Sequence, residues 1–297
     1  MKIDAVFSGG GVKAYAFVGA LESIEEKKLQ IERVAGTSAG AIVASFLAAG
    51  YRYEEINSLL NELDLKKFLD PPALSKMLPF TKWFFLYFQL GIYKGDKLEQ
   101  WIQQQLTKKN LNTFTDLKPG YLKVVVSDLS LGKMVVIPDD LQNNYGIDPN
   151  YFPIAKAIRM SAGFPYFFMP KKLPGKSQKK SIIVDGGLLS NFPLWVFENG
   201  ENKNNRPILG VKLNESIKGQ HQQKNIRNAF DMFHALFSTM KQAHDARYIS
   251  KSQKNNIIFI PVEGVGTTDF QLTNETKENL ISTGKSRADE FLKYWPK

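Results

Sequence analysis

The first fifty residues alternate between short apolar runs, glycine turns and helical patterns, and this order limits the fold more than any other feature of the sequence. Residues 3–7 form a short apolar run that stops at three consecutive glycines, and apolar side chains then recur at helical spacing. A second β-prone run, 31–35, leads through another glycine turn into a helix of small residues, which Gly50 closes. The order predicts a βαβα unit, and such units build parallel sheets that helices cover.

The rest of the chain continues this alternation. Residues 53–106 are predicted to be mostly helical, broken by prolines, and they include an aromatic cluster. No linker, repeat or low-complexity tract divides the sequence, so we expect a single domain over residues 1–297 with a helical, aromatic-rich insertion at about 51–120. Further strands are predicted at 122–127, 133–137, 182–184, 208–213 and 257–260, and further helices at 226–249 and 275–294.

Composition narrows the classes of function. The 297 residues are 43% hydrophobic, which supplies a sizeable core and excludes a disordered chain. There are no cysteines, so disulfide frameworks, thiol catalysis and thiolate metal sites are excluded. The 39 lysines and arginines against 29 aspartates and glutamates give a net charge of +10, which favours anionic partners such as phospholipid surfaces or nucleic acid. Nucleic-acid binding would need basic residues interleaved with stacking aromatics, and the sequence contains no such module.

The N-terminal sequence and the apolar segments bear on location. The chain runs from Met1 into the glycines without the apolar region of a signal peptide, so we expect a cytoplasmic protein. The longest apolar stretch, residues 80–93, is interrupted by polar residues and is well short of the roughly 20 residues that cross a bilayer. We therefore predict no membrane-spanning helix and expect any membrane contact to be peripheral.

The second glycine turn has the pattern of a serine nucleophile. Gly36-Thr37-Ser38-Ala39-Gly40 fits G-x-S-x-G, in which flanking glycines allow a sharp strand-to-helix turn that lifts the serine hydroxyl above the sheet. An ordinary tight turn is the alternative for so short a match. The predicted strand before it and helix after it favour the nucleophile.

The first glycine turn lies where it could hold an anion. Gly9, Gly10, Gly11 and Lys13 follow the first strand and open a helix, so backbone N–H groups converge there. The loop lacks the endings typical of a phosphate loop and of a dinucleotide site, which weakens a nucleotide interpretation. Because the first two strands of a βαβ unit are neighbours, this loop is expected beside Ser38, with oxyanion donors next to the serine.

A serine nucleophile needs a base, and the three histidines are poor candidates. His234 and His244 fall in a predicted helix among phenylalanines, and His221 lies in a polar run. An α/β-hydrolase with a Ser-Asp-His triad would also place several strands before its elbow, whereas only 37 residues precede Ser38.

A carboxylate is the remaining option. Asp185 ends an apolar strand and is followed by Gly186 and Gly187, at an edge where open α/β sheets bind ligands. A partly buried carboxylate that is hydrogen-bonded to a serine can take its proton directly. We therefore predict that Asp185 is the base for Ser38, with a plain Asp-Gly turn as the alternative.

With these elements identified, the chain resembles the patatin-like phospholipases. The family's glycine-rich oxyanion loop with a basic ending is matched by residues 9–13, its G-x-S-x-G serine by 36–40 and its D-G-G aspartate by 185–187. A fourth family block is similar to residues 157–170, where the serine, the proline and the Phe-x-Pro ending recur. The four blocks follow the family's order.

The resemblance implies a three-layer α/β/α fold with a mostly parallel central sheet. It implies a lipid acyl hydrolase with a Ser-Asp dyad and with no required metal or cofactor. One position departs from the family pattern, because Ala14 stands where a glycine usually follows the basic residue. We expect Ala14 to lie already in the helix, where alanine is favourable.

We therefore predict a serine lipid acyl hydrolase of the phospholipase A or esterase type, acting on phospholipids or related acyl lipids. Ser38 is the predicted nucleophile, Asp185 the base and later the acid, and the N–H groups of Gly10 and Gly11 hold the oxyanion. Two alternatives remain open: a non-catalytic lipid-binding protein with the same pocket, and a Ser-His-Asp esterase.

Two segments favour peripheral contact with an anionic membrane. The aromatic residues of 80–93, Trp83 and Phe84 among them, could form a lid, an acyl-chain channel, an interfacial anchor or a core helix. A basic loop before the strand of Asp185 could hold anionic headgroups, although a solvated loop explains it as well. The lysines of this loop are Lys171, Lys172, Lys176, Lys179 and Lys180.

Overall fold

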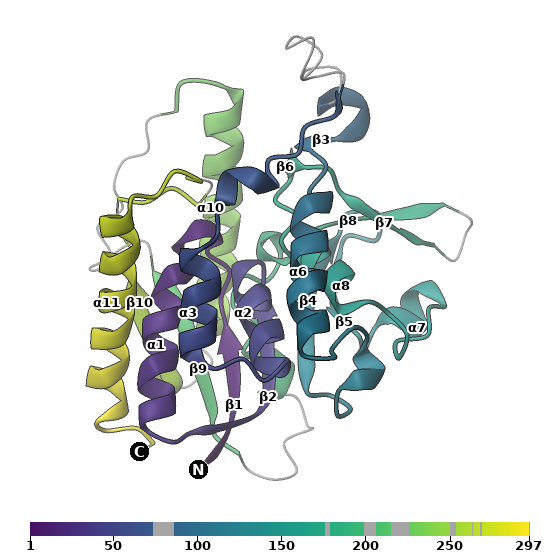
Figure 1. The fold of residues 1–297 in the computed structure, drawn as a ribbon. Coiled ribbons are helices and arrows are strands. Elements are labelled where there is room, and N and C mark those ends of the chain that lie inside the picture. The colour runs from purple at the N-terminus through teal and green to yellow at the C-terminus, as the bar shows by residue number, and fades with distance from the viewer. Residues whose placement is uncertain are drawn as a thin grey trace.

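A mostly parallel sheet forms the centre of the protein. The computed structural model describes residues 1–73, 86–175, 179–198, 206–214, 226–249, 254–262, 264–267 and 269–296. Within these residues the central sheet has eight strands, in the order β10-β9-β1-β2-β4-β8-β7, with β5 also paired to β4 (Figure 1). The mutually parallel strands are β1 (Lys2–Phe7), β2 (Gln30–Thr37), β4 (Leu122–Asp128), β9 (Ile208–Asn214) and β10 (Ile257–Pro261).

Antiparallel pairing extends the sheet on one side. Both β5 (Lys133–Ile137) and β8 (Lys180–Asp185) run antiparallel to β4, and β7 (Lys171–Pro174) runs antiparallel to β8. Two further strands, β3 (Gly91–Tyr93) and β6 (Tyr166–Phe168), pair in a small parallel sheet of their own.

Helices cover both faces of the central sheet, which confirms the expected fold class. The larger core lies under α2 and α8 on one face, and α1 and α11 lie side by side next to them (Figure 1). On the other face α9 and the end of α10 pack on Val6, Ala35 and Val125. The helices are α1 (Tyr15–Glu26), α2 (Ala39–Ala48), α3 (Tyr53–Asn61), α6 (Asp96–Lys108), α7 (Leu141–Tyr145), α8 (Ile154–Ser161), α9 (Trp195–Glu198), α10 (Ala229–Ile249) and α11 (Asn274–Leu292).

The registers place two strands end to end. Val124 and Val125 of β4 pair with β2 and also with β5, so β2 and β5 lie on opposite sides of β4. Residues 126–128 of β4 pair with β5 and with β8, so β8 lies on the same side as β2. The two strands therefore run toward each other along β4. The end of β2 at Thr37 and the end of β8 at Asp185 are one residue apart in register.

The strands predicted from apolar runs are all confirmed, and so are the predicted helices α1, α2, α10 and α11. The strands β3, β6 and β7 were not predicted, because each has only three or four residues. Part of the aromatic cluster, Phe80 and residues 83–85, lies outside the described residues. No helix in the described part of the chain combines the length and the apolar character needed to cross a membrane.

Candidate active site

Ser38 sits on a sharp turn between β2 and α2. Its backbone has φ 53° and ψ −123°, a region that costs a residue with a side chain about 1–3 kcal/mol. The turn closes tightly, because a Cβ on Gly36 would overlap the backbone of Gly40, and one on Gly40 would overlap the carbonyls of Phe7 and Ser8. The two motif glycines thus allow the predicted nucleophile elbow.

A buried hydroxyl holds the backbone of this turn. The N–H of Ser38 donates to Ser161 Oγ at 2.8 Å, and that hydroxyl donates to the carbonyl of Val125 at 2.6 Å. Ser161 ends α8 and is fully buried. The sequence showed Ser161 only as a recurring serine of the fourth family block, without a role.

Asp185 directly contacts Ser38. Its Oδ2 accepts a hydrogen bond from Ser38 Oγ at 2.7 Å, and its Oδ1 accepts from the N–H of Gly187 at 2.7 Å. The side chain is 4% exposed, and this burial raises the pKa of Asp185 to about 6. The two hydrogen bonds and the charges of Lys241 and Arg159 oppose the rise in pKa.

The position of Asp185 follows from the end-to-end strands. The prediction for Asp185 used the rule that open α/β sheets bind ligands at the carboxyl ends of their parallel strands. The strand β8 is antiparallel to β4, so this rule does not explain the position of Asp185. The carboxyl end of β8 reaches the site from the opposite direction. Beyond it, Gly186 lies against Val125 and Thr37, and Thr37 Oγ1 donates to the carbonyl of Ser190 at 3.0 Å.

The glycine loop presents two N–H groups near Ser38. Gly10 and Gly11 line the same cavity as Ser38, and their N–H groups have no acceptor among the described residues. The N–H of Gly9 donates to the carbonyl of Asn191 at 2.9 Å, and that of Lys13 to the carbonyl of Gly10 at 3.3 Å. Of the four loop residues predicted for the oxyanion hole, Gly10 and Gly11 are therefore the two whose N–H groups are not already bonded within the described residues.

The remaining loop positions have other surroundings. The side chain of Lys13 is buried and lines the cavity. Ala14 has φ −57° and ψ −18°, so it is helical, as expected, and carries no strain in place of the family's glycine.

An apolar cavity of about 430 Å³ opens onto these residues. Away from Ser38 it runs beneath α2, α3 and α6, where its walls are aliphatic and aromatic. A cavity of this size and lining fits a hydrocarbon chain. Its apolar wall includes Ile42, Val43, Phe46, Leu60, Leu63, Leu65, Phe68, Leu98 and Trp101.

Asn191 is a site residue that sequence reasoning missed. It is buried, lines the cavity and holds the glycine loop through its carbonyl. Its amide donates to Asp245 at 3.2 Å, and Asp245 forms a buried ion pair with Lys212. The feature of the sequence that could have identified Asn191 is its polar side chain in the mostly apolar run after Gly187.

One of the three histidines, His244, has a side chain that the structure describes. His244 is not among the residues that line the cavity. His221 and the side chain of His234 lie outside the described residues. Within the described part of the chain, no three His, Cys, Asp or Glu side chains gather as a metal site would require.

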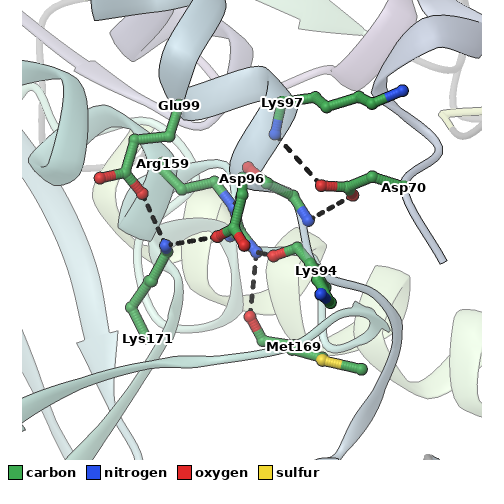
Figure 2. A network of polar contacts seen from close by, with 9 residues as sticks. Asp70, Lys94, Asp96, Lys97, Glu99, Arg159, Met169 and Lys171 are labelled. Carbon is green, nitrogen blue, oxygen red and sulfur yellow. Dashed lines mark hydrogen bonds and ion pairs between the residues drawn. The ribbon is translucent and has the colours of Figure 1, made fainter. Parts of the chain in front are cut away.

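A buried arginine network supports the loop beside the site (Figure 2). Arg159 of α8 donates to the carbonyls of Gly95 at 3.0 Å, Lys94 at 2.7 Å and Met169 at 2.9 Å. Asp70 accepts from the N–H groups of Gly95 and Lys97, which caps the start of α6. The fourth family block thus ties β3 and β6 to α6.

The predicted basic loop is less available than its lysines suggest. Lys171 forms ion pairs with Asp96 at 3.0 Å and Glu99 at 2.6 Å, so its charge is neutralised within the protein (Figure 2). Lys172, Lys179 and Lys180 are exposed, and Lys176 lies outside the described residues.

Comparison with known proteins gives a family and close relatives. A family model described as a patatin-like phospholipase matches residues 5–198. The chain is 49% identical to the uncharacterized protein YqhO of Bacillus subtilis over 295 residues, which is 99% of each chain. It is 23% identical over 215 residues to a protein of Invertebrate iridescent virus 6 named as a probable lipid hydrolase, covering 68% of this chain and 65% of that one.

Solved structures share the fold. VipD from Legionella pneumophila superposes with a TM-score of 0.59 at 19% identity, over 98% of this chain and 66% of VipD. ExoU from Pseudomonas aeruginosa, in complex with SpcU, gives a TM-score of 0.52 at 16% identity, over 98% of this chain and 52% of ExoU. The chain therefore spans only part of these two proteins.

Proposed function

The chain belongs to the patatin-like phospholipase family, and from this premise we propose that it is a serine acyl hydrolase that cleaves acyl esters of phospholipids through Ser38 and Asp185. A lipid hydrolase is the activity that the family and its relatives support. The observation that carries the finer proposal is the 2.7 Å hydrogen bond from Ser38 Oγ to Asp185 Oδ2 at the opening of an apolar cavity.

The first half of the reaction forms an acyl-enzyme. Asp185 takes the proton of Ser38 as Oγ attacks the ester carbonyl, and the N–H groups of Gly10 and Gly11 hold the oxyanion that develops. The ester C–O bond then breaks, and the leaving alcohol takes the proton from Asp185. A carboxyl with a pKa of about 6 suits both steps, because it can accept a proton near neutral pH and return it.

The second half restores the enzyme. Water gives a proton to Asp185 while its oxygen attacks the acyl carbon, and the fatty acid leaves as Ser38 Oγ recovers the proton. The apolar arm beneath α2 holds the acyl chain throughout, since burial of each CH₂ group contributes about 0.8 kcal/mol.

Contact with a membrane is part of the proposal, and an exposed apolar surface supports it. Tyr87 is 77% exposed and Phe88 64% exposed, and both precede Gly91, which pairs with Tyr166. The ring of Tyr166 contacts Phe233 of α10 at a centroid distance of 4.7 Å, so this surface continues onto that helix. On α10, an apolar stripe of Met232, Leu236 and Met240 is exposed.

The elements that carry this surface, residues 86–93 and the first turns of α10, lie toward the top of Figure 1, beyond the carboxyl ends of the parallel strands. Ser38 directly follows the carboxyl end of β2. Apolar insertion there would bring the cavity to the lipid, and the net charge of +10 would favour an anionic bilayer.

A fluorophosphonate probe tests the nucleophile. The wild-type protein should be labelled at Ser38, identified by peptide mass, and should release fatty acid from a short-chain phospholipid. Ser38→Ala should lose labelling and lower turnover by about 10⁴-fold or more, whereas Ser58→Ala, at an exposed serine of α3, should retain both. Unlabelled wild-type protein with no ester turnover would favour a lipid-binding protein, and loss of turnover in His234→Ala with retention in Asp185→Asn would favour a Ser-His-Asp esterase.

A further inference from the structure

The cavity has a polar feature that the proposed reaction does not use. The charged side chains that line it are Lys13, Asp185, Asp231 and Lys241. The last two belong to α10, which lies beyond the residues that the family model matches. The motifs that define the family therefore say nothing about their role.

One side of α10 faces the cavity. Four of its lining residues are spaced three or four positions apart along the chain. This spacing places them on one side of the helix, opposite the apolar stripe. Phe233 and Phe237 hold the helix in this orientation, because their rings pack on Phe164 at centroid distances of 6.2 and 4.8 Å. These four residues are Asp231, Ala235, Ser238 and Lys241, and Phe237 of the same helix also lines the cavity.

Lys241 is a half-buried cation of α10. It has no hydrogen bond or ion pair with any residue that the structure describes, although it lines an apolar cavity. Two other lysines with little exposure have carboxylate partners, since Lys212 pairs with Asp245 and Lys171 with Glu99. A cation that is partly removed from water gains most from an anion that completes its hydrogen bonds.

The charge of Lys241 reaches the reacting groups. It lowers the pKa of Asp185, so the ammonium acts on the base through the cavity. An anionic group of a substrate beside the scissile ester would be repelled by ionised Asp185, and a cation facing the same cavity offsets that repulsion. A neutral ester would need no such group.

We propose that Lys241 binds the phosphate of the substrate and thereby selects acyl lipids that carry a phosphate group close to the scissile ester. This assignment rests on the proposed hydrolysis at Ser38, because it names the substrate class of that site. Ser238, one turn earlier on the same side of α10, lines the cavity next to this subsite.

The test compares two substrates that differ in the phosphate group. Dihexanoylphosphatidylglycerol and dihexanoylglycerol carry the same acyl chains, and only the first is a phosphodiester. At pH 8, well above the pKa of Asp185, a change in ionisation of the base affects both substrates alike. Lys241→Met should lower the ratio of kcat/KM values, phosphodiester over neutral lipid, by about 10- to 100-fold, as expected for a charge-assisted hydrogen bond.

Two variants serve as comparisons. Lys241→Arg keeps the charge and should retain most of the ratio. Lys293→Met removes one charge from the exposed residue after α11 and should leave the ratio and the activity unchanged. An unchanged ratio in Lys241→Met would overturn the subsite.

Binding without turnover separates this proposal from the proposed function. In a Ser38→Ala background, titration calorimetry should show that Lys241→Met weakens binding of the phosphodiester relative to the neutral lipid. If the wild type hydrolyses neither lipid, the proposed function fails regardless of this ratio. If it hydrolyses both and the binding ratio does not change, only the phosphate subsite fails.

Discussion

Replacing the proposed base should stabilise the protein while it removes activity. Asp185 is 4% exposed and its pKa is raised from 3.8 to about 6. At 1.36 kcal/mol per pKa unit, ionising this carboxyl in the folded state costs up to about 3 kcal/mol relative to the unfolded state. The asparagine introduced by Asp185→Asn would not ionise, and its amide could keep the contacts of Asp185 with Ser38 and Gly187.

The sign of the effect follows from the raised pKa. The favourable contribution of protonated Asp185 is fully present below about pH 3.8 and is lost as the pH rises through about 6, because the folded state binds the proton more tightly. Asp185→Asn should therefore match the wild type near pH 4. At pH 8 it should be more stable by up to about 3 kcal/mol, which is roughly 5 °C in Tm for a chain of this size.

Thermal unfolding from pH 4 to pH 8 at constant ionic strength measures the difference in stability between Asp185→Asn and the wild type. The titration of all other groups cancels in this difference. Glu62→Gln, at the exposed end of α3, is the matched control and should give a flat difference. If Asp185→Asn differs from the wild type by the same amount at pH 4 and pH 8, or is the less stable protein at pH 8, the burial argument is wrong.

Three further outcomes test the site. On a neutral short-chain ester, kcat/KM should rise as the pH increases through about 6, where Asp185 loses its proton, and Lys241→Met should move this midpoint upward in a pH–rate profile. Gly11→Ala should lower kcat by about 10²–10³-fold with little change in KM, because its φ of +57° and the overlap of a Cβ with the Thr267 carbonyl shift the donors. Gly132→Ala is the control for backbone strain, because Gly132 also has a positive φ, +62°, but a Cβ there would meet open space. This variant should keep kcat if backbone strain alone is harmless. Leu236→Gln should weaken binding to anionic vesicles in co-sedimentation by about 5-fold or more, or about 1 kcal/mol, whereas Leu131→Gln, at a similarly exposed leucine, should not.

Local signals allowed much of the fold to be predicted. Apolar runs such as residues 122–127 and 208–213 become strands because they are buried on both faces of the sheet, and that burial shows directly in the sequence. The elbow at Ser38 was recognisable for the same reason, since its strand, turn and helix are contiguous. The fold class followed from the order of these elements.

Features that depend on distant pairing were not predictable. The strands β3 and β7 contain glycine, lysine and proline, and β6 has only three residues. All three exist because partner strands bind their backbones. The pairing of Lys171 with Glu99 depends on the placement of α6 against β7, and only the structure shows it. The same holds for Lys241, since α10 has no motif and its cavity face is defined by packing on Phe164.

The meeting of Ser38 and Asp185 depends on strand register more than on either motif. In a strand, a shift of one residue turns every side chain to the opposite face, so a one-residue slip of β8 along β4 would turn Asp185 away from Ser38. Two contacts fix the register at this point. The N–H of Asp185 donates to the carbonyl of Gly163 at 3.0 Å, and Gly186 lies so close to the Val125 carbonyl that a Cβ would overlap it. The glycine after the aspartate in the D-G-G motif is therefore a requirement of packing against β4, and through that packing it positions the proposed base.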